Sequence, residues 1–184
     1  TNKVVLAGEV RGPEIKKDEL IEKVRGCIKD IGYDQDGFTW KEATKIESHL
    51  HSQSADIAMG VDSLGNKDEG AGDQGIMFGY ACSETESLMP APIDLSHRLV
   101  KQQSEVRKNG GLDWLRPDAK SQVSAEYDDA GNINGLSAIV LSTQHDPDIS
   151  QEELKIEVLE KIIKPIVRNA VSYTHLTLPT KLSV

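Results

Sequence analysis

Aromatic residues are scarce in this 184-residue chain, at 4% of the sequence, and cysteine occurs only twice. A hydrophobic core therefore has to be built from Val, Ile, Leu and Ala, within an apolar content of 38%. Cys27 and Cys82 lie far apart and form no CxxC pair, which argues against a zinc site and against a disulfide framework. The five histidines do not form the HExxH motif of zinc proteases.

Long apolar runs and long basic runs are also missing. No apolar stretch approaches the length of a transmembrane helix, so we expect no membrane span. The chain has 21 basic and 30 acidic residues, a net charge of -9 and no long basic run. We therefore expect no nucleic-acid partner, because phosphate backbones are bound by clustered Lys and Arg. The N-terminus shows no signal-peptide pattern, and the acidic balance suits a cytoplasmic protein.

The first half of the chain predicts a strand, a helix, a weaker strand and a long loop. Val4–Ala7 has the apolar character of a buried strand, and Gly8 closes it. A helix is predicted from Lys16 to a C-cap glycine at Gly32, because its apolar residues recur at helical spacing. Residues 38–49 alternate weakly, as in another strand. Residues 51–75 are rich in Gly, Ser, Asp and Gln, which predicts a polar loop that is either functional or disordered.

The second half predicts a strand, a helix, a β-hairpin and a final helix. The strand is expected at 76–81, and the helix runs from Pro92 to about Asn109. The hairpin has strands at 122–127 and 136–143 around a turn at 128–132. The final helix begins at the capping box Ser150–Glu153 and ends at Pro165. This order predicts an α/β or α+β fold. It contains two sheet-and-helix units that share a rough strand-helix-strand plan.

A glycine-rich stretch, Gly70–Gly75, formally matches GxGxxG. A dinucleotide-binding fold would place a buried strand before this motif and a helix after it. Asp62–Glu69 is polar, and a strand is expected after Gly75, so the context disfavours that interpretation. The alternatives are a flexible turn that leads into a strand and a close approach of the backbone to a ligand, with Asp73 as the polar contact.

A second polar cluster, Leu115–Ser121, carries two cations and an acid just before a predicted strand. Lys120 can serve as a phosphate partner, because its ammonium is a compact point charge. Asp118 can accept a hydrogen bond from a ribose or a base. The alternative is a solvated turn in which Asp118 and Lys120 form a near-pair.

Taken together, these segments resemble the S-adenosylmethionine synthetase (methionine adenosyltransferase) family. The resemblance centres on the twelve residues Gly70–Ala81, and the flanking segments occur in the family's order. These segments are Gln53–Ile57 with Gly60–Asp62, Met89–Ile93 with His97–Leu99, Leu115–Val123, Leu141–His145 and Ile162–Ile166. The match extends from about residue 1 to about residue 167.

The resemblance implies a transferase that forms S-adenosylmethionine from ATP and L-methionine, with release of phosphate and pyrophosphate. It implies Mg²⁺ and K⁺ as cofactors and a homodimer or homotetramer whose active site lies between two subunits. A hypothesis from another class is a non-catalytic nucleotide-binding or interaction module with the same fold. A dinucleotide enzyme is a third possibility, disfavoured because no strand precedes Gly70.

The resemblance also assigns residues. Glu9 corresponds to the acid that contacts the methionine amine, and Gln53 to a second methionine contact. ATP contacts fall on Asp73 and on the stretch Asp118, Ala119 and Lys120, with Lys120 directed toward the phosphates as the catalytic residue. The segment from Gln53 to about Glu69 is then expected to act as a lid over the site. No metal ligand is assigned, because the family's ligands are expected outside this chain.

Four segments follow from this comparison. Residues 1–56 are the expected remainder of an N-terminal domain, 57–69 a mobile active-site loop and linker, and 70–168 the central domain. Residues 169–184 do not resemble the family, and we expect them to be translated vector or adapter sequence; the alternative is a divergent strand. Since the chain also starts at Thr1 without Met, we expect a fragment of about half a family member that is inactive alone.

Overall fold

The computed structural model describes residues 2–13, 15–53 and 75–170, with side chains to Val167. The chain divides into two compact units, Thr1–Phe78 and Gly79–Val184. The boundaries predicted near residues 56 and 69 lie in the segment 54–74, outside the described residues, so they stay predictions. No helix in the described part of the chain is long and apolar enough to cross a membrane.

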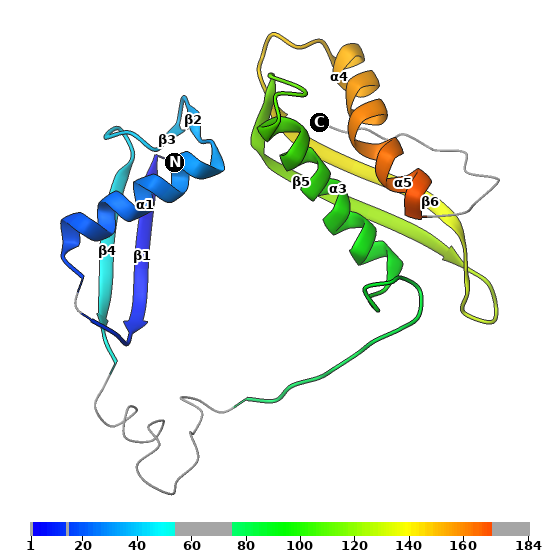
Figure 1. Ribbon diagram of the computed structural model, residues 1–184, viewed down its shortest axis with the longest axis horizontal. Coiled ribbons are helices and arrows are strands. Elements are labelled where there is room, and N and C mark those ends of the chain that lie inside the picture. Colours follow the sequence, from blue (N-terminus) through cyan, green and yellow to red (C-terminus); the bar gives the residue numbers. More distant parts are fainter. Residues whose placement is uncertain (1, 14, 54–74, 171–184) are drawn as a thin grey trace, which may run out of the picture. The chain divides into compact units, whose positions relative to one another are not determined.

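The first unit is a strand-helix-strand unit with a small hairpin inserted. Its elements are β1 (Lys3–Val10), α1 (Lys17–Ile31), β2 (Asp34–Gln35), β3 (Phe38–Thr39) and β4 (Lys45–Ser52) (Figure 1). Strands β1 and β4 pair in parallel, from Lys3 opposite Lys45 to Val10 opposite Ser52. Parallel strands need a long crossover, which α1 supplies.

The predicted helix and its glycine cap are confirmed in this unit. Gly32 adopts a left-handed conformation with φ 103°, and its N–H donates to the carbonyl of Ile28 at 3.2 Å. The single strand expected at 38–49 is wrong, because β3 and β4 are separated by a turn at residues 40–44.

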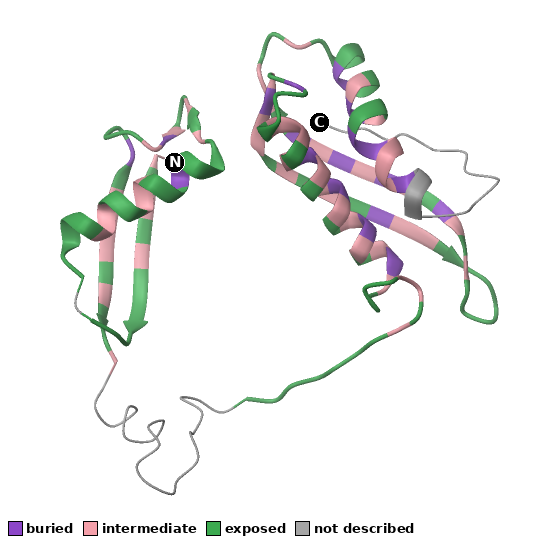
Figure 2. Cartoon of the chain, in the orientation of Figure 1, coloured by how far each residue is buried: buried purple, intermediate pink, exposed green. Residues whose placement is uncertain are grey.

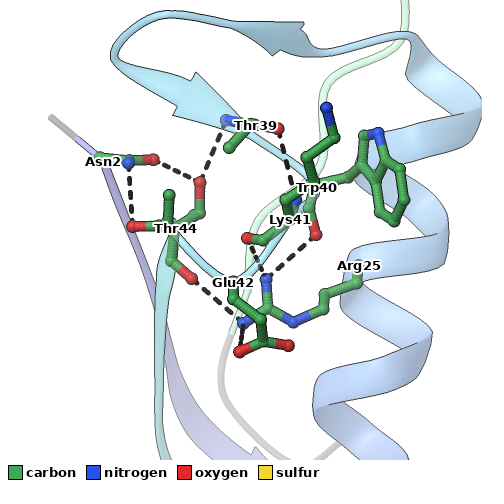
Figure 3. Close-up of polar contacts among 8 residues, drawn as sticks. Asn2, Arg25, Thr39, Trp40, Lys41, Glu42 and Thr44 are labelled. Carbon is green, nitrogen blue, oxygen red and sulfur yellow. Dashed lines mark hydrogen bonds and ion pairs between the residues drawn. The ribbon is translucent and has the colours of Figure 1, made fainter.

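That turn is tied to α1 by Arg25 (Figure 3). The guanidinium donates from Nη1 to the carbonyl of Trp40 at 3.0 Å and from Nη2 to the carbonyl of Thr44 at 3.2 Å. Thr44 is fully buried, and its hydroxyl accepts from the N–H of Thr39 at 3.0 Å and donates to Asn2 Oδ1. Polar contacts therefore fix the point at which β4 begins.

The second unit packs helices on one face of an antiparallel hairpin (Figure 1). Its elements are α3 (Ala91–Lys108), β5 (Leu115–Tyr127), β6 (Ile133–His145), α4 (Gln151–Val158), the π-helix η1 (Leu159–Ile163) and α5 (Lys164–Ala170). The hydrophobic core lies between the helices and the hairpin (Figure 2). It consists of Leu95, Leu99, Leu112, Leu115, Val123, Leu136, Ile139, Leu141, Leu154, Val158, Ile162, Ile163 and Val167.

Several boundaries in this unit differ from the sequence predictions. Strand β5 begins at Leu115 instead of residue 122, so the polar cluster lies inside the strand. The last helix does not end at Pro165: the π-helical turn η1 joins α4 to α5, and Pro165 is the second residue of α5. Its missing N–H leaves the carbonyl of Lys161, four residues earlier, without an α-helical donor, and Gln102 Nε2 donates to that carbonyl at 3.2 Å. Residues 76–81 form no strand in the structure, and Met77 is 96% exposed.

The mixed helix and strand content confirms the α/β (α+β) class. The two units do not share one plan, however. The first is built on a parallel pair with a helical crossover, whereas the second is built on an antiparallel hairpin.

Candidate functional site

Glu9 and Gln53 lie at the same end of the parallel pair β1–β4. Glu9 is opposite His51 in the register, and the N–H of Gln53 donates to the carbonyl of Val10 at 3.1 Å. This is the end at which both strands finish, and ligands of open parallel sheets bind beyond the carboxyl ends of the strands. The two residues assigned to methionine are therefore brought together by the ladder.

Charged side chains line the exposed surface of β1 and β4. His51 Nε2 lies 3.5 Å from Glu9 Oε1, and Glu9 is 44% exposed. Farther along the same pair, Lys3 Nζ contacts Glu47 Oε1 at 2.7 Å. The hydrogen bond from Lys3 lowers the pKa of the Glu47 carboxyl below its ordinary value. The negative charge of Glu47 is thus already paired with Lys3, whereas Glu9 has only a histidine beside it in the described structure.

Asp118 and Lys120 are exposed on β5, and Ala119 between them is half-buried. Ala119 stands opposite Thr143, and Lys120 stands opposite Ser142. The next residue, Ser121, donates from its hydroxyl to the carbonyl of Ser96 on α3 at 2.7 Å, so this side of the strand faces the helix. Asp118 and Lys120 consequently project from the opposite face, which the helices of this unit leave uncovered.

The ladder is interrupted immediately before these residues. Leu115 stands opposite His145 and Ala119 opposite Thr143, so three residues of β5 face Gln144 alone. This is a β-bulge, and bulges re-aim the side chains they contain. Arg116, the first of the three, forms an ion pair with Asp146 just beyond the end of β6.

The remaining predicted contacts lie elsewhere in the chain. Asp73 and the expected lid up to Glu69 lie outside the described residues, except for Gln53. Glu9 and Gln53 belong to the first unit, and Asp118, Ala119 and Lys120 to the second.

Sequence reasoning missed one residue beside the stretch Asp118–Lys120. Gln103 lies on the buried face of α3, where it donates to the carbonyl of Arg116 at 2.9 Å and to Thr143 Oγ1 at 3.0 Å. The signal was present in the sequence: Leu95, Leu99 and Gln103 recur every four residues, so a polar residue interrupts an apolar stripe.

No group of three or more His, Cys, Asp or Glu side chains in the described part of the chain could hold a metal ion. This finding concerns protein side chains alone, because Mg²⁺ at nucleotide sites is commonly held by one or two carboxylates together with substrate phosphates.

Comparison with known proteins identifies relatives over most of the chain. The sequence model of the family described as S-adenosylmethionine synthetase, central domain, matches residues 68–181. The S-adenosylmethionine synthase of Pelagibacter ubique is 62% identical over 171 residues, which cover 93% of this chain and 42% of that protein. The synthase of Granulibacter bethesdensis is 60% identical over 158 residues, which cover 84% of this chain and 40% of that protein.

The S-adenosylmethionine synthase of Rhodospirillum centenum is 55% identical over 163 residues, 89% of this chain and 42% of that protein. This chain therefore spans less than half the length of these relatives. The family match covers more than half of the chain and includes the bulged strand with Asp118, Ala119 and Lys120. On this ground, the chain belongs to the S-adenosylmethionine synthetase family.

Proposed function

We propose that this chain provides ATP- and methionine-binding residues of a methionine adenosyltransferase, a transferase of S-adenosylmethionine biosynthesis and one-carbon metabolism. The observation that carries the proposal is the uncovered face of β5, where Asp118 and Lys120 project side by side in a chain that is 62% identical to a synthase. An acid that accepts from a ribose or base, next to a cation for phosphate, is a suitable pair for a nucleotide.

The chemistry of the proposed reaction requires little proton transfer. The thioether sulfur of methionine attacks the 5′ carbon of ATP, and the C–O bond to tripolyphosphate breaks. Tripolyphosphate is then hydrolysed to pyrophosphate and phosphate. A thioether carries no proton to remove, so the demands are alignment of sulfur with carbon and stabilisation of a polyanionic leaving group.

Each candidate residue has a role in this scheme. Glu9 pairs with the methionine ammonium, and Gln53 contacts the same substrate. Asp118, Ala119 and Asp73 contact ATP. Lys120 contacts the phosphates and stabilises the charge that grows as tripolyphosphate leaves. The segment between Gln53 and Glu69 closes over the bound substrates.

The proposal includes Mg²⁺ and K⁺, a cytoplasmic location and assembly into a homodimer or homotetramer, all on the strength of family membership. Mg²⁺ would neutralise charge on the polyphosphate.

Calorimetry with a non-hydrolysable ATP analogue tests the binding assignment. We expect the 184-residue chain to bind the analogue and Lys120→Ala to weaken binding about tenfold, the loss of one charge-assisted contact. Lys155→Ala is the matched control, because Lys155 is an exposed lysine of the same unit on α4. Equal losses in both variants would contradict the assignment of Lys120.

A turnover assay tests catalysis separately. We expect negligible formation of S-adenosylmethionine by the purified chain with methionine, ATP, Mg²⁺ and K⁺. Robust turnover would contradict this expectation. Tight, metal-independent analogue binding that is lost in Lys120→Ala, without any turnover, would favour the alternative, a non-catalytic nucleotide-binding module.

A further inference from the structure

Gln103 is a polar side chain in the middle of the apolar face of α3. It is 1% exposed, and Leu99 one turn earlier is fully buried. A buried side-chain amide is costly unless its donors are satisfied. The partners of Gln103 therefore explain its place in the core.

Those partners are one residue of the bulge in β5 and one residue of the facing strand β6. Nε2 of Gln103 donates to the carbonyl of Arg116, the first bulged residue, and to the hydroxyl of Thr143, which faces Ala119 directly after the bulge. The Thr143 hydroxyl in turn donates to the carbonyl of Gln144 at 3.3 Å, so Gln103 and Thr143 have defined donor and acceptor roles.

The bulge has little support from the ladder itself. Three residues, Arg116 to Asp118, face Gln144 alone, and Pro117 among them has no backbone N–H. The ion pair of Arg116 with Asp146 holds the outer edge, but both side chains are about one-third exposed. On the buried side, the described contact that spans the bulge is the Gln103 amide.

We propose that Gln103 is a positioning residue for the nucleotide site. By bonding across the bulge, it fixes the backbone from Arg116 to Ala119 and so sets the direction in which Asp118 and Lys120 project. Gln103 itself touches no substrate. The inference rests on the proposed function only in assuming that Asp118 and Lys120 contact ATP; the effect on the bulge does not depend on that function.

The test compares Gln103→Met with Gln102→Met in the 184-residue chain. Both changes replace a glutamine of α3 by an apolar residue of similar length. Gln102 donates only to the carbonyl of Lys161 on η1 at 3.2 Å in the described structure, so it serves as the matched control. The measurements are the backbone amide NMR shifts of Asp118 to Lys120 and the Kd of a non-hydrolysable ATP analogue.

We expect Gln103→Met to move the three amide shifts and raise the Kd about tenfold, as expected for the loss of a positioning hydrogen bond. Gln102→Met should change neither quantity. Unchanged amide shifts in folded Gln103→Met would overturn the proposal, as would equal effects of the two variants. If the unsubstituted chain does not bind the analogue, the proposed function fails, and the amide shifts still decide the positioning role.

A second variant applies if Gln103→Met does not fold. In Gln103→Glu the ionised side chain cannot donate to the Arg116 carbonyl, whereas the protonated acid can. Amide shifts of Asp118 to Lys120 should therefore return toward those of the unsubstituted chain as the pH is lowered. In the unsubstituted chain itself, the side-chain amide protons of Gln103 should exchange slowly with solvent. Fast exchange of these protons would overturn the proposal without any variant.

Discussion

Arg25 on α1 donates to the carbonyl of Thr44, the residue immediately before β4, at 3.2 Å. The same guanidinium reaches the carbonyl of Trp40 at 3.0 Å, so one side chain holds both ends of the turn (Figure 3). The Arg25 side chain is 11% exposed. Since β4 contains His51 and leads directly to Gln53, this contact relates the packing of the helix to the end of the sheet at which we place methionine.

Arg25→Lys should destabilise the first unit by about 2 kcal/mol, because a lysine ammonium cannot span several carbonyls as the planar guanidinium does. The measurement is urea unfolding followed by Trp40 fluorescence in a Trp114→Phe background, where Trp40 is the only tryptophan. The ion pair with Glu42 should contribute little, because Glu42 is 90% exposed.

Lys23→Met provides the control for Arg25→Lys. Lys23 also lies on α1, but it is exposed and pairs only with Glu19 one turn away at 3.3 Å in the described structure. Its substitution should change the free energy of unfolding by less than about 0.5 kcal/mol. A similar loss in both variants would show that the turn does not depend on Arg25.

Gln103 and Thr143 should be coupled in stability. Gln103→Met leaves the Thr143 hydroxyl without its buried donor, and Thr143→Val leaves the amide with one acceptor fewer, so each change should cost about 1–3 kcal/mol. Replacing both removes the mismatch, and the double variant should be more stable than the sum of the single effects by about 1 kcal/mol. Urea unfolding followed by Trp114 fluorescence in a Trp40→Phe background gives the double-mutant cycle. Additivity within about 0.3 kcal/mol would contradict the coupling.

The hairpin turn should lose stability in acid through Asp128. The side chain of Asn132 donates to Oδ2 at 3.1 Å, and the N–H groups of Asn132 and Ala130 donate to Oδ1 at 2.8 and 3.0 Å. These bonds, that of the Asn132 side chain first, hold the pKa of Asp128 below its ordinary value of 3.8. Because the folded pKa lies below the unfolded one, the contribution is complete above the unfolded value and is lost as the pH falls through the folded value.

Carboxyl NMR titration of the hairpin measures this effect. Asn132→Ala should raise the pKa of Asp128 toward 3.8, since the side-chain donor is its largest cause. Asn134→Ala, two residues farther along and exposed, should leave the titration unchanged. A pKa that does not move in Asn132→Ala would show that the backbone bonds alone are responsible.

The helices could be predicted from the sequence because the residues that start and end a helix lie within one turn of its ends. The Gly32 cap and the Ser150 cap, whose hydroxyl accepts from the N–H of Glu153 at 3.2 Å, depend on residues within one turn. Strand boundaries did not follow, because pairing decides them. Leu115–Ser121 is polar enough to predict a turn, yet β6 recruits it into the sheet through a register that includes a bulge.

The residues of the candidate site stay predictions, whereas the contacts that support them were not foreseen. Glu9 and Gln53 came from resemblance, and Lys120 came also from its place in a polar cluster. The parallel register that brings Glu9 near Gln53 was not foreseen. Gln103 is 13 positions from Arg116 and 40 from Thr143, and no local pattern reports such pairings. The sequence shows only that Gln103 occupies a position where the helical spacing of Leu95 and Leu99 predicts an apolar residue.

Glu9→Gln should raise the Kd for L-methionine about tenfold to a hundredfold, because the amide lacks the charge that pairs with the methionine ammonium. Isothermal calorimetry of the 184-residue chain measures this. Glu47→Gln is the matched control: Glu47 is a partly exposed carboxylate of the same strand pair, but its charge is held by Lys3 at 2.7 Å. We expect its Kd to stay within about twofold of the unsubstituted value, since an ion pair on the surface contributes little. An equal rise in both variants would show that net charge, and not the position of Glu9 beside Gln53, governs binding.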